Sequence, residues 1–96
     1  MKIICGIIGV NGKVQKGTGF SVEIGQSDQQ WTTYNLSLTG GENIEDYVVV
    51  CQQGSASGGG PLVTGLQGVN LLNITTWTRG VNPVIPAFNF IAIKED

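Results

Sequence analysis

The chain contains no histidine, and only 12% of its 96 residues are charged. Without histidine, a serine or cysteine nucleophile lacks its usual general base, and a zinc site lacks its commonest nitrogen ligand. The two cysteines, Cys5 and Cys51, are far apart and share no metal-ligand spacing. These absences argue against an enzyme, a metal site and a resident cofactor, and we expect none of the three.

Basic residues are also scarce, since five lysines and arginines stand against seven acids and the formal charge is -2. A nucleic-acid-binding surface needs a patch of positive charge that neutralises phosphates, so we expect no nucleic-acid partner. The first apolar stretch, Met1–Val10, contains two glycines and is too short for a secretory signal or a membrane span. We interpret it as the first strand of a soluble chain made in the cytoplasm, with no signal peptide and no membrane insertion. Its final location stays open.

Alternation of apolar and polar side chains is what the chain does have. Phe20–Ile24 and Thr32–Leu38 alternate with a period of two, which is typical of half-buried strands. Further strands are predicted at Met1–Val10, Lys13–Gln15, Tyr47–Cys51, Asn70–Arg79 and Ala87–Lys94. The pattern therefore predicts one all-β domain over residues 1–96, a small antiparallel β-sandwich of about six to eight strands.

Three local features carry further expectations. Asn11-Gly12 is the typical pair for a two-residue hairpin turn, so the N-terminus should form a β-hairpin. The unbroken apolar run Tyr47–Cys51 predicts a central strand that is covered on both faces. Cys5 and Cys51 are interpreted as small buried hydrophobic residues. A disulfide between them stays open, because it requires their strands to be near neighbours.

Three of the seven acids, Glu42, Glu45 and Asp46, cluster before the run that begins at Tyr47. Such a cluster can in principle supply the paired carboxylates of a hydrolase or bind calcium. The spacing does not match a calcium loop, and a solvated acidic turn is the plainer interpretation.

Trp77 and Arg79 lie on one face of the predicted Asn70–Arg79 strand. An exposed indole can stack on the apolar face of a sugar while polar neighbours hydrogen bond to its hydroxyl groups. The alternative is that Trp31 and Trp77 fill the core or a contact between subunits.

Several pieces of the chain, taken in order, resemble the layout of a known family. They are Gly12–Val14, Gly17–Val22, Tyr34–Leu38, Tyr47–Val50, Ile74–Trp77 and Ala87–Ile93. This layout resembles the small β-sandwich of H-type lectins and of the C-terminal domains of phage tail-fibre proteins. The resemblance implies an antiparallel sandwich, assembly into trimers and, for the lectins, binding of N-acetylgalactosamine-type sugars at loops near subunit boundaries.

In H-type lectins, a Trp/His arrangement before the last strand contacts the sugar, whereas this chain has Trp77–Gly80 there and no histidine. The sugar specificity of the family is therefore not carried over. By position, the resemblance implies Trp77, Arg79 and Asn82 as ligand-binding residues. Our own hypothesis adds the segment Gly25–Trp31 of an adjoining subunit, with Asp28 and Trp31 as further ligand-binding residues.

We expect a non-enzymatic, oligomeric binding module with a glycan as its ligand and further copies of the chain, as a trimer, as its partners. The alternative is a structural module of a phage-like fibre or another trimeric particle, in which the apolar 41% of the residues serves subunit contacts. A hydrolase built on Glu42, Glu45 and Asp46 ranks last.

Overall fold

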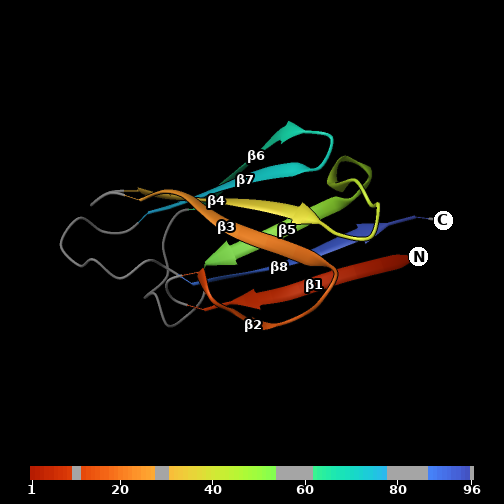
Figure 1. The fold of residues 1–96 in the computed structure, drawn as a ribbon, viewed down its shortest axis with the longest axis horizontal. Coiled ribbons are helices and arrows are strands. Elements are labelled where there is room, and N and C mark those ends of the chain that lie inside the picture. The colour runs from red at the N-terminus through yellow and green to blue at the C-terminus, as the bar shows by residue number, and fades with distance from the viewer. Residues whose placement is uncertain (10–11, 28–30, 54–61, 78–86, 96) are drawn as a thin grey trace.

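The computed structural model describes residues 1–9, 12–27, 31–53, 62–77 and 87–95. Within these residues the chain forms eight strands and the short 3-10 helix η2 (Figure 1). They are β1 (Lys2–Ile8), β2 (Val14–Lys16), β3 (Phe20–Ser27), β4 (Trp31–Leu38), η2 (Ile44–Asp46), β5 (Val48–Gln53), β6 (Leu62–Gly68), β7 (Leu71–Trp77) and β8 (Phe88–Lys94). The predicted all-β class is confirmed. No helix in this described part is long and apolar enough to cross a membrane.

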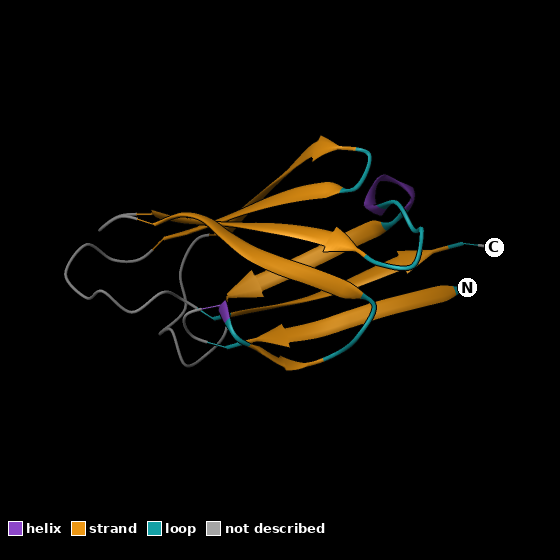
Figure 2. Ribbon diagram, viewed as in Figure 1, coloured by secondary structure: helices purple, strands orange, loops and turns teal. Residues whose placement is uncertain are grey.

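The strands form two four-stranded sheets that face each other as the layers of a β-sandwich (Figure 2). The first sheet has the order β2-β1-β8-β5, and the second sheet has the order β3-β4-β7-β6. Every pairing between neighbouring strands is antiparallel. Each sheet therefore has an inner face toward the other sheet and an outer face directed away from it.

The core lies between the inner faces and follows the alternation of the sequence. In β4, Tyr34, Leu36 and Leu38 are buried as predicted, while the residues between them are partly exposed. In β8, the same pattern buries Phe88 and Phe90. The buried apolar cluster consists of Ile4, Ile8, Tyr34, Leu36, Leu38, Ile44, Tyr47, Leu72, Ile74, Phe88, Phe90 and Ala92.

Two aromatic pairs connect the sheets across this core. The ring centroids of Tyr34 and Phe88 lie 4.8 Å apart, and those of Phe20 and Phe90 lie 4.9 Å apart in an edge-to-face arrangement. Such pairs contribute about 0.5–1.5 kcal/mol beyond the area that they bury. Gly6 makes room for the second pair, because a Cβ there would lie 2.4 Å from the Phe20 ring. Burial raises the pKa of Tyr34 to about 12.

The predicted N-terminal hairpin is confirmed, since β1 pairs with β2 in antiparallel orientation. Its connection is longer than the predicted two-residue turn, because β1 ends at Ile8 and β2 begins at Val14. The backbone N–H of Gly9 donates to the carbonyl of Lys13 at 2.7 Å and closes this loop. Gly12 has a φ of 77°, the left-handed conformation that the Asn-Gly signal requires.

The prediction of a central strand at Tyr47–Cys51 is wrong. β5 lies at the edge of the first sheet, and Val48 and Val50 on its outer face are 71% and 61% exposed. The misleading signal was the continuous apolar run, which indicates apolar residues on both faces but not what covers them.

The two cysteines also differ from expectation. Cys5 is exposed on β1, whereas Cys51 is half-buried on β5, and both are free. Their strands lie on opposite sides of β8. Two strand spacings of about 4.8 Å exceed the Cα separation of about 7 Å that a disulfide allows. The open question of a disulfide is thereby answered in the negative.

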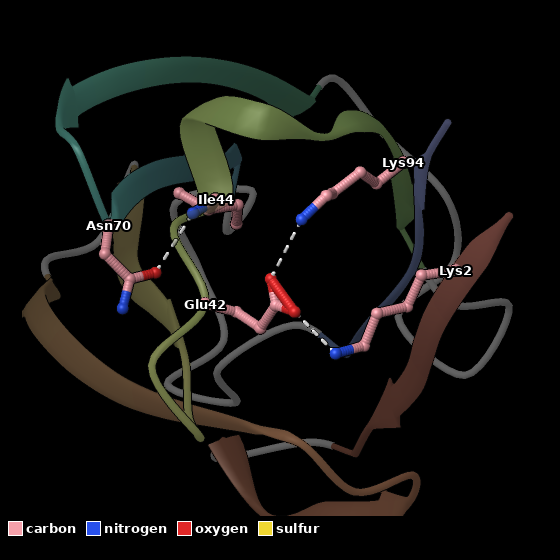
Figure 3. A network of polar contacts seen from close by, with 5 residues as sticks. All are labelled: Lys2, Glu42, Ile44, Asn70 and Lys94. Carbon is pink, nitrogen blue, oxygen red and sulfur yellow. Dashed lines mark hydrogen bonds and ion pairs between the residues drawn. The ribbon is translucent and has the colours of Figure 1, made fainter. Parts of the chain in front are cut away.

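Asn70, in the turn between β6 and β7, holds the segment that leads from β4 to η2. Its Oδ1 accepts hydrogen bonds from the backbone N–H groups of Leu38 at 2.9 Å and Ile44 at 3.2 Å (Figure 3). Its Nδ2 donates to the carbonyl of Leu38 at 2.7 Å. Between these anchors the chain turns through Gly40 and Gly41, whose φ values of 72° and 80° favour glycine. One side chain therefore satisfies three backbone groups.

Candidate functional site

Polar side chains form rows across the strands on the outer face of the second sheet. We define the outer polar face as Glu23, Trp31, Thr33, Asn35, Ser37, Asn73 and Thr75. One row pairs Glu23 on β3 with Asn35 on β4 and Asn73 on β7. The next row pairs Thr33 with Thr75. Strand alternation puts all of them opposite the core.

Hydrogen bonds between these side chains fix the orientation of two amides. Asn73 Nδ2 donates to Asn35 Oδ1 at 3.2 Å, and the Thr75 hydroxyl donates to Asn73 Oδ1 at 3.3 Å. The Asn35 amide lies over Gly25, where an added Cβ would come within 2.9 Å of Nδ2. The outer polar face is therefore preorganised by its own side chains, on strands that the core holds in place.

Trp31 begins β4 and lies at the end of this face, with 41% of its surface exposed. The backbone register pairs it with Trp77, the last residue of β7. Only the backbone of Trp77 is described, and the predicted site residues Asp28, Arg79 and Asn82 lie outside the described residues. The fold thus pairs the backbones of Trp31 and Trp77 within one chain, whereas our hypothesis from the sequence places the two residues in different subunits.

The chemistry of this face suits a neutral ligand rich in hydroxyl groups. The amides of Asn35 and Asn73 and the threonine hydroxyls each donate and accept hydrogen bonds. The Trp31 indole adds an apolar surface beside them, and Glu23 adds an acceptor. Sequence reasoning missed Asn35, Thr33 and Thr75. The sequence pattern that could have identified them is their outward position in strands with alternating side chains. That these residues share one surface becomes clear only when the neighbouring strands are known.

Glu42 belongs to a second polar cluster, which joins the loop before η2 to both terminal strands. Its Oε1 accepts from Lys2 Nζ at 2.5 Å, and its Oε2 lies 3.5 Å from Lys94 Nζ (Figure 3). The hydrogen bond from Lys2 lowers the pKa of Glu42, and the same bond raises the pKa of Lys2. Lys94 Nζ also lies 5.7 Å from the centroid of the Tyr47 ring. The cluster closes one end of the sandwich.

The acids Glu42, Glu45 and Asp46 do not act as one set. Glu45 and Asp46 are exposed on η2, whereas Glu42 is held by the lysines. A general acid needs a raised pKa, and that of Glu42 is lowered. Among the described residues, no group of three or more acids and cysteines is placed to bind a metal ion. We therefore attach no chemistry to this cluster.

A pocket of about 250 Å³ opens between the edge strands β5 and β6. Its lining consists of Ile44, Glu45, Tyr47, Val49, Thr64, Gly65, Leu66 and Leu72. This volume is below the ~300–1,000 Å³ of ordinary small-molecule sites. The pocket is therefore small for a ligand site, and the outer polar face is the stronger candidate.

No protein-family model matches the chain, and searches of curated proteins and of solved structures likewise find no match.

Proposed function

We propose that the protein is a non-enzymatic, oligomeric binding module that recognises carbohydrate on its outer polar face. The observation that carries the proposal is the exposed Trp31 indole at the end of the hydrogen-bonded row of Asn35 and Asn73. The resemblance to H-type lectins favours the same class of ligand. Trp77, Arg79, Asn82 and Asp28 remain predicted contacts of the same ligand.

The size of this face sets the expected affinity of one copy. Each hydrogen bond to a sugar hydroxyl contributes about 0.5–1.5 kcal/mol, and stacking on an indole contributes a similar amount. Three or four such contacts give roughly 4 kcal/mol before the cost of association is subtracted, so one copy should bind no more tightly than about 1 mM. Several copies on one particle raise the avidity by about 10²–10⁴ without any new contact. The proposal therefore combines a weak site on each copy with assembly of several copies, which raises the avidity.

A glycan array probed with the labelled protein tests the proposal. We expect saturable binding to a subset of sugars, weakened about tenfold or more in Trp31→Ala and Asn35→Ala, since each removes one contact of about 1.4 kcal/mol. Asn43→Ala is the control, because Asn43 is exposed beside η2 and belongs to neither outer sheet face. Binding that survives both substitutions, or silence across all sugars, contradicts a site at this face.

A structural module without a small ligand is the second candidate. It is favoured by the apolar side chains exposed on the outer face of the first sheet, which include Ile3, Val48 and Val50. A silent array together with a stable oligomer would favour this candidate over the carbohydrate-binding one.

A further inference from the structure

The outer face of the first sheet is apolar over two complete rows. We define the outer apolar face as Ile3, Cys5, Ile7, Val48, Val50, Ile91 and Ile93. One row runs from Ile3 through Ile93 to Val48. The central row runs from Cys5 through Ile91 to Val50. Neither row contains a charged residue.

The two outer faces of the sandwich contrast sharply in chemistry. A sheet face directed to water is ordinarily polar, and the outer face of the second sheet meets this expectation except at Val63 and Leu71. In the first sheet, β1 directs isoleucine to both sides, with Ile4 and Ile8 buried and Ile3 and Ile7 exposed. Lys2 and Lys94 do not interrupt this face, because both reach to Glu42 on the other side of the sheet (Figure 3).

We infer that the outer apolar face binds a second copy of this chain. The inference locates the subunit contact that the proposed function requires, and it does not depend on the ligand. The five most exposed isoleucines and valines of the outer apolar face present on the order of 500 Å² of apolar surface. This area lies in the upper part of the range for the largest apolar patch of a monomer. A stable contact buries about 800 Å² per partner, and the remainder is available from Cys5, Ile93 and the polar rim.

The shape and chemistry of this face select a copy of itself as the occupant. Rows of β-branched side chains on a sheet pack face to face on an equivalent sheet, at a spacing of about 10 Å. The rim is polar at the next row, where Ile7 is flanked by Lys16 on β2 and by Asn89 and Gln52 on the other side, as expected around the core of a subunit contact. Without charges in its two apolar rows, the face offers no electrostatic feature that would favour a different, charged partner.

The chain offers a closely matched pair of variants as the test. Val50 and Val63 are both valines in edge strands, both are 61% exposed, and they lie on the outer faces of opposite sheets. Sedimentation or light scattering across a concentration series should show an oligomer for the wild type and for Val63→Lys. In Val50→Lys, a lysine buried in the contact should weaken assembly about 100-fold or more. A monomeric wild type, or equal assembly of both variants, overturns the inference.

Alkylation of Cys5 provides a readout that needs no substitution. Cys5 lies in the central row, so its labelling rate should fall in proportion to the fraction assembled. Cys51 is the internal reference, because its burial raises its pKa to about 11 and its labelling should not depend on assembly. If the labelling rate of Cys5 stays constant while the oligomer forms, the inference is overturned. This readout does not depend on whether Val50→Lys folds.

The glycan proposal and this inference fail separately. Val50→Lys should keep the single-site affinity for a monovalent sugar and lose only the avidity on an array. If the array is silent while Val50→Lys still dissociates the oligomer, the ligand is wrong and the contact surface stands. The face-to-face contact is two-fold, so a dimer satisfies the inference, whereas the trimer that the resemblance implies would need a different contact.

Discussion

Substitution of Asn70 by alanine tests whether one side chain holds the β4–η2 segment. The change removes partners from the N–H and carbonyl of Leu38 and from the N–H of Ile44. Each lost hydrogen bond costs about 1 kcal/mol, and more where the backbone group stays out of reach of water. Because the three bonds are partly buried, we expect the free energy of unfolding to fall by about 2–4 kcal/mol. That is a large share of the ~5–15 kcal/mol of a typical domain.

Urea unfolding followed by tryptophan fluorescence measures this loss. Asn70→Asp should not restore stability at neutral pH, because it keeps the acceptor for Leu38 and Ile44 but replaces the Nδ2 donor by a carboxylate oxygen that faces the Leu38 carbonyl. Asn43→Ala is the matched control, since Asn43 is exposed and its side chain makes no capping hydrogen bond to η2. We expect it to change stability by less than about 0.5 kcal/mol. Equal unfolding curves for Asn70→Ala and Asn43→Ala would refute the reasoning.

Two further predictions concern packing and pH. Gly6→Ala should destabilise the protein by about 1–3 kcal/mol in the same urea assay, because the new methyl group collides with the Phe20 ring. Gly65→Ala is the control and should be neutral or slightly stabilising, because a Cβ at Gly65 would have no atom nearer than 3.8 Å. Similar losses in both variants would contradict the packing argument. The lowered pKa of Glu42 means that its stabilisation is present above its ordinary value of 4.5 and is lost as the pH falls through the lower folded-state value. Urea midpoints should therefore drop more steeply below pH ~4.5 in the wild type than in Glu42→Gln, and parallel pH profiles would exclude this role.

The sequence predicted much of the local structure. The alternation in Thr32–Leu38 correctly identified the buried side chains of β4, and the Asn-Gly signal correctly identified the N-terminal hairpin. Both depend on residues close together in the chain, where backbone geometry alone assigns each side chain to a face. The candidate site was harder to predict from the sequence than the strands. Trp31 was named as a candidate while its burial was left open, and joining Trp31 and Asn35 to Asn73 required the register of β4 and β7.

The apolar run in β5 shows where sequence reasoning fails. An unbroken series of valines is compatible both with a central strand and with an edge strand that has an apolar outer face. Val50 is exposed because it lies on the outer face of the first sheet, and none of the strands in the described residues packs over that face. The same ambiguity affected Cys5, which alternation placed on a strand without indicating which face of that strand would be buried.

The all-β class and the period-two burial of β4 and β8 could be predicted from the amino-acid sequence, because they follow from the extended backbone and the apolar pattern of consecutive residues. The packed fold was needed to show that Asn70 reaches Leu38 and Ile44, that Trp31 pairs with Trp77, and that the apolar and polar outer faces lie on opposite sheets. The reason is that strand order and register join residues far apart along the chain. The strand pattern allows many such pairings, and only the packed sandwich selects one of them.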